Sequence, residues 1–218
     1  TLLLGVVVSR IKRIPLVYDA HEHYAMMVAT DLPKPLTQLM DRLEAILVRR
    51  AALVIAANEK IAEYLRPHVR GRLTVVSNCI DLPEMTASVA RSEGRLKIFY
   101  AGALEPLRFI EECADAVRKR DDCMLSVAGQ GRLEEDMERR AGEKVAFLGY
   151  LDYPEMLNRM SRCHVVLCLM DPSNENNRIG TPNKLYEGMA LGIPLLTSRR
   201  TLAGDIVERE GCGLAIDW

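Results

Sequence analysis

Short apolar runs alternate with amphipathic segments along most of this chain, and this alternation limits its possible folds more than any other feature. Runs such as residues 52–58, 96–104 and 164–171 are almost continuously apolar, as in strands that are buried on both faces. Between such runs, segments such as residues 36–47 repeat apolar side chains at helical spacing. This order predicts an α/β protein, in which parallel sheets are covered by helices on both faces.

The segment DLPEMTASVARSEG at residues 81–94 breaks this alternation. It loses the periodicity of its neighbours and gathers Pro, Ser, Thr and Gly, as interdomain linkers do. We therefore expect a Rossmann-like N-terminal domain at residues 1–82, a linker at 83–95 and a second Rossmann-like domain at 96–218. In doubly wound sheets of this kind, ligands bind at the carboxyl ends of the strands.

Composition narrows the class of partner. The formal net charge of the 218 residues is -1, so no overall positive field favours nucleic acid. The six cysteines form no C-x-x-C pair and several lie in apolar runs, which indicates buried thiols of a reducing compartment. The opening TLLLGVVVS is too short to span a bilayer. A cytoplasmic location follows, with contact at the inner face of the membrane left open.

The stretch RIGTPNKLYEGMALGIPLL, residues 178–196, carries the strongest functional signal. An eleven-residue connection at 171–181 precedes its helix, and connections of that length at a strand's carboxyl end are often functional. Thr181 is predicted as the N-cap, with Pro182 at the first helical position. The free amides and the positive dipole end of this first turn suit a phosphate.

Two charged residues of this helix share one face. Lys184 lies in the first turn, where a cation is unfavourable by roughly 0.3 to 1 kcal/mol unless an anion is near. Glu187 follows three residues later, and a carboxylate at such a place can accept two ribose hydroxyls. The physics alone leaves a second interpretation open, namely a capped surface helix with an exposed Lys–Glu pair.

The segment PNKLYEGMALGIP, residues 182–194, resembles the donor-site helix of glycosyltransferase family 4 almost position for position. Weaker similarities follow in the family's order: VRRAALVIAANEKIAEYL, VVSNCID, IFYAGALEPLRFIEE, LSVAGQGRLEE and VAFLGYLDYPEM. They cover nearly the whole chain. The resemblance implies two Rossmann-like domains of the GT-B fold and retaining, metal-independent transfer from a nucleotide-diphosphate sugar, with no further cofactor.

The same resemblance assigns roles to individual residues. Glu187 would bind the ribose of the donor, Arg108 and Lys184 its diphosphate, and His21 would face the donor sugar. Fixed cations and helix amides could then stabilise the leaving diphosphate without a metal. The remaining donor-binding positions that we expect are Gly102, Gly129, Arg178, Thr181, Pro182 and Asn183.

The chain departs from the family pattern at several places. Ile179 stands eight positions before Glu187, where the family has a second acidic residue, and Gly102-Ala103 replaces a Gly-Arg pair. His21 and His23 form an H-x-H pair that could suggest a metal, although no acidic partner is placed by the sequence, so no metal is expected. The first domain is expected to be incomplete, with the terminal helices missing, so that the chain is a fragment.

The predicted function is transfer of a sugar from a UDP- or GDP-type donor to a glycan or lipid-linked acceptor. One alternative is a non-catalytic nucleotide-sugar binding module, which Ile179 motivates. Another is a sugar-nucleotide 2-epimerase, for which His21-Glu22-His23 is the candidate acid/base cluster. A nicotinamide oxidoreductase is disfavoured because the turn GQGRLE lacks the third glycine of G-x-G-x-x-G.

Overall fold

The computed structural model describes residues 2–29, 31–80 and 94–217, and the chain forms two compact units. The first comprises Thr1–Asn78 and Ser173–Thr181, and the second comprises Cys79–Pro172 and Pro182–Trp218. One short segment therefore departs from the expected division, because Ser173–Thr181 groups with the first unit rather than with the second. The expected linker at 83–95 lies almost wholly outside the described residues.

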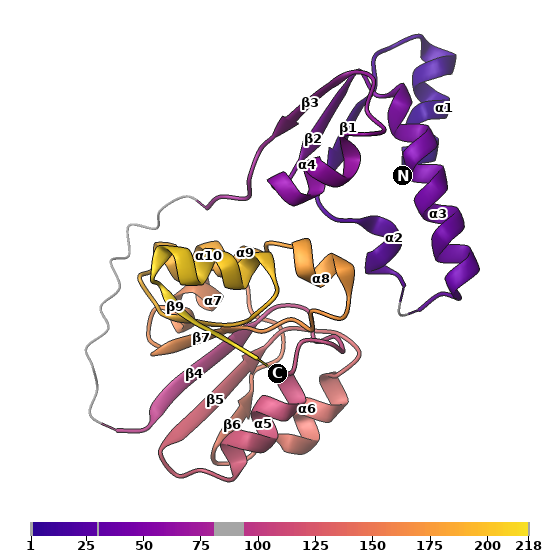
Figure 1. Cartoon of the computed structure of the whole chain (residues 1–218). Coiled ribbons are helices and arrows are strands. Elements are labelled where there is room, and N and C mark those ends of the chain that lie inside the picture. The colour runs from indigo at the N-terminus through magenta and orange to yellow at the C-terminus, as the bar shows by residue number, and fades with distance from the viewer. Residues whose placement is uncertain (1, 30, 81–93, 218) are drawn as a thin grey trace. The chain divides into compact units, whose positions relative to one another are not determined.

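The second unit is built on a six-stranded parallel sheet with the order β6-β5-β4-β7-β8-β9 (Figure 1). Its strands are β4 (Leu96–Ala101), β5 (Cys123–Ala128), β6 (Val145–Phe147), β7 (Val165–Cys168), β8 (Leu195–Ser198) and β9 (Gly213–Ile216). The chain adds β5 and β6 on one side of β4, then crosses to the other side for β7, β8 and β9. The order therefore reverses between β4 and β7.

Helices cover both faces of this sheet, as the continuous apolar strands predicted (Figure 1). One face packs against α5 (Ile110–Arg118) and α6 (Glu134–Arg140). The other packs against α7 (Tyr153–Met160), α9 (Asn183–Ala190) and α10 (Leu202–Glu210). Successive residues of β4 point to opposite faces, so that Phe99 belongs to the second core and Tyr100 to the first.

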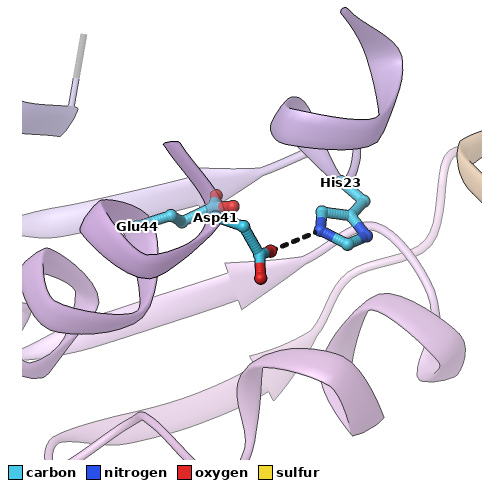
Figure 2. Close-up of side chains that lie close together, drawn as sticks. All are labelled: His23, Asp41 and Glu44. Atoms are coloured by element: carbon cyan, nitrogen blue, oxygen red, sulfur yellow. Dashed lines mark hydrogen bonds and ion pairs between the residues drawn. The ribbon is translucent and has the colours of Figure 1, made fainter. Parts of the chain in front are cut away.

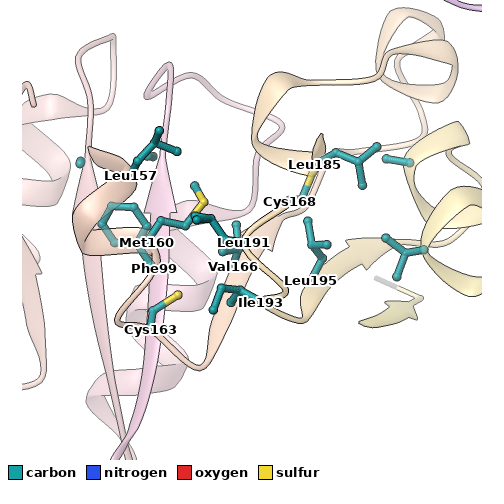
Figure 3. Close-up of a cluster of buried hydrophobic side chains, with 14 of the residues drawn as sticks. Phe99, Leu157, Met160, Cys163, Val166, Cys168, Leu185, Leu191, Ile193 and Leu195 are labelled. Carbon is teal, nitrogen blue, oxygen red and sulfur yellow. The ribbon is translucent and has the colours of Figure 1, made fainter. Parts of the chain in front are cut away.

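Buried apolar side chains form the core beneath α7, α9 and α10 (Figure 3). Phe99, Met160, Leu185 and Leu195 are among its members, each with 2% or less of its surface exposed. Leu185 comes from the same helix as the candidate donor residues. Burial of this apolar side chain, which contributes about 1.5–3 kcal/mol, fixes the rotation of α9 and with it the direction of the opposite face.

All six cysteines are free thiols, and five of them are at least half-buried. Cys123, Cys163 and Cys168 are fully buried, and burial raises the pKa of Cys163 to about 12 and that of Cys168 to about 11. Cys79 is exposed, so the prediction of buried thiols is wrong at that position.

The first unit contains a three-stranded parallel sheet in the order β1-β2-β3. Its strands are β1 (Val17–Ala20), β2 (Leu53–Ala56) and β3 (Arg72–Val75). Its helical segments are α1 (Leu2–Lys12), α2 (Tyr24–Met27), α3 (Lys34–Leu47), η1 (Val48–Arg50), α4 (Glu59–Leu65) and α8 (Glu175–Ile179). The fold is thus α/β with two separate parallel sheets, as expected.

A buried polar network fastens α3 to the turn that follows β1 (Figure 2). His23 is 3% exposed and its Nε2 lies 2.9 Å from Asp41 Oδ1. Its ring stacks on Tyr64, with 3.9 Å between the ring centroids, and the Tyr64 hydroxyl donates to Asp41 at 2.7 Å and to Glu44 at 3.2 Å. Tyr18 donates to Glu44 at 2.5 Å. These bonds satisfy two carboxylates that lie close together.

The network makes a prediction about acid stability. Burial alone would raise the pKa of Asp41, but hydrogen bonds from Tyr64 and His23 outweigh it and hold that pKa below its usual value. A carboxyl of this kind stabilises the fold above its unfolded pKa of about 4 and loses that effect as the pH falls through the lower folded value. Asp41→Asn should therefore cost about 1–2 kcal/mol at pH 7, and less at pH 3.

Urea unfolding of both proteins at pH 7 and pH 3 measures this difference. The matched control is Glu22→Gln, because Glu22 is exposed and its substitution should change stability by less than about 0.5 kcal/mol at either pH. A cost of Asp41→Asn that is the same at both pH values would contradict the account of the network.

Candidate functional site

A cavity of about 580 Å³ opens at the carboxyl ends of three neighbouring strands of the second unit. Its walls are formed by residues that end or follow β4, β5 and β7, by residues just before and within the first half of α7, and by α9. This is the point at which the strand order reverses, and the connections that leave β4 and β7 there diverge to opposite faces of the sheet. The cavity thus lies at the strand edge where the sequence predicted ligand binding.

Two glycine turns form one wall of the cavity. Gly102 and Gly129 have φ values of +143° and +139°, which side chains rarely adopt. The turns also touch, because a Cβ on Gly129 would lie 1.8 Å from the carbonyl oxygen of Gly102. The Gly102 amide donates to Ala128 O at 3.1 Å. Only glycine at Gly129 permits this close approach of the two turns.

Helix α9 begins one residue later than the sequence predicted. Pro182 is its N-cap, with φ -67° and ψ 148°, and the cap makes no side-chain hydrogen bond. Thr181 was expected at this position, but it is buried in the first unit, where Asn58 Nδ2 donates to its hydroxyl at 3.4 Å. The prediction of a Thr181 cap is therefore wrong, because that hydroxyl is used elsewhere. Pro182 and Asn183 line the cavity.

Lys184 and Glu187 share the cavity-facing side of α9, as their spacing predicted. They are not an exposed surface pair, since Lys184 is half-buried and Glu187 is only 5% exposed. Burial raises the pKa of Glu187, and the charge of Lys184 and a hydrogen bond from Tyr153 act in the opposite direction. A buried carboxylate with few fixed donors can accept hydrogen bonds from ligand hydroxyls.

Arg108 reaches the cavity from a strained loop rather than from a helix. Helix α5 begins only at Ile110, two residues after Arg108. Leu107 and Phe109, which flank Arg108, have φ values of +65° and +54°, a conformation that is unfavourable for large side chains. Such strain often occurs at functional sites. Arg108 lies on the cavity wall.

The remaining predicted residues belong to the first unit. His21 follows β1 and is exposed, with its Nε2 3.0 Å from Asp19 Oδ2. Arg178 lies in the last turn of α8, a short helix within the connection at 171–181. Thr181 is the last residue of the same connection. The structure thus gathers Gly102, Arg108, Gly129, Pro182, Asn183, Lys184 and Glu187 in one cavity and places His21, Arg178 and Thr181 in the other unit.

Sequence reasoning missed three tyrosines that line the cavity, namely Tyr100, Tyr150 and Tyr153. Tyr100 stands two residues before the glycine turn, and Tyr150 follows Gly149 directly. Tyr150, directly after Gly149, was a signal that could have been used, whereas nothing in the sequence distinguishes Tyr100 from the other apolar residues of β4.

The network of His23, Asp41 and Glu44 is the group in the described ranges whose ligand atoms lie close enough to hold a metal ion, all within 4.8 Å of one another (Figure 2). Tyrosine hydroxyls already donate to both carboxylates. His23 Nδ1 is buried without a hydrogen-bond partner, so a proton is better placed on Nε2, toward Asp41, than on Nδ1. A metal on Nε2 would require the opposite tautomer. The residues therefore fit a hydrogen-bond network better than a metal centre.

The contact between the two glycine turns generates a prediction. Gly129→Ala should destabilise the second unit by roughly 2–4 kcal/mol, because the added Cβ meets backbone atoms and φ is unfavourable. Gly142→Ala is the matched control, since a Cβ there meets nothing within 4 Å, and it should change stability by less than about 0.5 kcal/mol. Thermal unfolding of both variants measures this difference. Equal melting temperatures of the two variants would contradict the close packing of the two glycine turns.

Two protein families and a curated protein match parts of this chain. The family described as "Glycosyl transferases group 1" matches residues 95–217, more than half of the chain. The family described as "Glycosyltransferase Family 4" matches residues 1–84. A curated relative is "Putative glycosyltransferase YtcC" of Bacillus subtilis (strain 168), 26% identical over an alignment of 140 residues; the match covers 57% of this chain and 33% of YtcC.

Two solved structures share the fold. The structure of Anabaena Alr3699/HepE in complex with UDP and glucose matches with a TM-score of 0.72 and 18% identity, over 99% of this chain and 61% of that chain. The structure of WaaG, a glycosyltransferase involved in lipopolysaccharide biosynthesis, matches with a TM-score of 0.69 and 15% identity, over 92% of this chain and 61% of that chain. The chain thus spans about three fifths of these structures and a third of YtcC.

Among the residues that the structure describes, no helix combines the length and the apolar character needed to cross a membrane. The two parallel α/β units are those of the GT-B fold, as the structural matches indicate. With a family match over more than half of its length, the chain belongs to the group 1 glycosyl transferases.

Proposed function

We propose that the cavity of the second unit binds a nucleotide-diphosphate sugar and that the protein transfers the sugar, with retained anomeric configuration, to a glycan or lipid-linked acceptor. The observation that carries the proposal is the placing of Lys184, Glu187 and Arg108 around one cavity at the strand-order reversal. Relatives of the same fold have been solved with UDP and a sugar bound, which supports a donor of this chemical class.

Each residue has a physical task in this proposal. The buried carboxylate of Glu187 accepts hydrogen bonds from the two ribose hydroxyls, and the half-buried ammonium of Lys184 lies within the same cavity to meet the diphosphate. The free amides at the start of α9 add positive potential there. Gly102 and Gly129 line the same cavity, so the backbone of both turns can meet the nucleotide.

The reaction breaks the anomeric C–O bond and leaves negative charge on the β-phosphate. Arg108, Lys184 and the start of α9 already line the cavity, so their positive groups can stabilise that charge with little reorganisation. This supplies the charge stabilisation from the protein's own groups, and we therefore propose a reaction that needs no metal. His21 is proposed to face the donor sugar.

A non-catalytic binding module is the second candidate, and Ile179 is the observation that favours it. Its side chain packs, partly buried, against the apolar core of the first unit, so the position that holds an acid in much of the family points into protein here. The epimerase interpretation is weakened, because His23, one of the three residues of its candidate acid/base cluster, is buried and bonded to Asp41.

Calorimetric titration with UDP, GDP and ADP tests the donor site. We expect selective binding of one nucleotide, weakened by about 1.5–3 kcal/mol in Lys184→Ala and in Glu187→Gln through the loss of charged hydrogen bonds. The matched controls are Lys119→Ala and Glu138→Gln in the same unit, which replace exposed side chains outside the cavity and should bind as the wild type does. Equal affinity in all five proteins would contradict the proposed site.

Incubation with the corresponding nucleotide sugar then separates the two candidates. A transferase should release free sugar slowly by hydrolysis, and the first anomer seen by NMR should have the donor's configuration. Donor binding without any release of sugar would favour the binding module and remove catalysis from the proposal.

A further inference from the structure

The ammonium group of Lys184 rests on an aromatic ring. Lys184 Nζ lies 3.5 Å from the centroid of the Tyr100 ring, and both residues line the cavity. Throughout the described part of the second unit, no carboxylate lies within ion-pair distance of Lys184. The cation in the first turn of α9, which conflicts with the helix dipole, is thus accommodated by the negative face of a ring.

The ring itself is firmly held. Tyr100 is 1% exposed and is the penultimate residue of β4. Its hydroxyl donates to the carbonyl oxygen of Ala103, beyond the glycine turn, at 2.6 Å. The side chain is therefore held at its base by the strand and at its tip by this hydrogen bond. A Cβ on Gly102 would lie 3.0 Å from Lys184 Nζ, so the glycine also leaves the space that the ammonium occupies. Together Tyr100 and Gly102 form a preformed seat for the Lys184 ammonium.

An aromatic seat differs from a carboxylate partner in one decisive respect. A carboxylate would neutralise the lysine and compete with an incoming phosphate, whereas the ring attracts the cation and leaves its full charge available. Holding the long side chain in place also removes part of the entropy that the lysine would otherwise lose when a ligand binds. The seat therefore prepares the ammonium for an anion in the cavity.

We propose that Tyr100 is a positioning residue that holds Lys184 at the diphosphate subsite of the donor. This inference rests on the proposed function, and it adds a residue that neither its position in the sequence nor the assigned donor contacts had indicated. Tyr100 acts through Lys184, so its effect should depend on the presence of that lysine and on the number of phosphates in the ligand.

A double-mutant cycle on nucleotide binding tests the proposal. With whichever of UDP, GDP and ADP the wild type binds, Tyr100→Leu should weaken binding roughly 3- to 30-fold, the range of a cation–π contact. In the Lys184→Ala background the same substitution should change affinity less than about 2-fold. Tyr100→Leu should weaken the binding of the corresponding nucleoside monophosphate less than it weakens the binding of the diphosphate. Tyr100→Phe, which keeps the ring, should retain most of the wild-type affinity.

The possible outcomes distinguish a failure of the Tyr100 proposal from a failure of the proposed donor site. An equal loss with and without Lys184 would show that Tyr100 acts only through the fold and would overturn the inference, while leaving the donor site intact. Absence of binding of all three nucleotides to the folded wild type would overturn both. Because the buried Tyr100→Leu could fail to fold, a wild-type measurement is included: NMR should show the Lys184 ε-protons shifted upfield by the ring. Unshifted ε-protons would overturn the inference without any variant.

Discussion

Between β4 and β7 the chain changes the side of the large sheet on which it adds strands, and the connections that leave these two strands therefore diverge. Ligand-binding crevices in parallel α/β sheets arise at such points, and here the crevice is the 580 Å³ cavity. The packing of Leu185 into the core fixes the rotation of α9, which turns Lys184 and Glu187 toward the cavity. Charged groups that would be solvated on a surface helix are instead partly withdrawn from water, where their interactions with a ligand are stronger.

Much of this arrangement could be predicted from the sequence. The continuous apolar runs indicated parallel strands covered on both faces, because only such strands bury every side chain. The spacing of Lys184 and Glu187 placed them on one face of a helix, and the family-like segment 182–194 indicated that this face meets a ligand. These features could be predicted from local periodicity, because they depend on residues that are close in sequence.

The features that the sequence did not predict depend on contacts between distant segments. Thr181 has the residue type of an N-cap, but its hydroxyl bonds to Asn58, more than a hundred residues earlier. The start of α5 at Ile110 is set by two residues with positive φ, Leu107 and Phe109, and no propensity favours that conformation for large side chains. The seat that Tyr100 provides for Lys184 likewise joins two elements that are far apart along the chain.

The central claim is that α9 and the glycine turns of the second unit form one site for a nucleoside diphosphate. The most direct test is a crystal structure of the protein with the bound nucleotide that calorimetry selects. The account predicts that the ribose hydroxyls lie within hydrogen-bond distance of the Glu187 carboxylate, with the diphosphate against Lys184 and the first turn of α9. A nucleotide bound elsewhere, or one whose ribose lies away from Glu187, would contradict it.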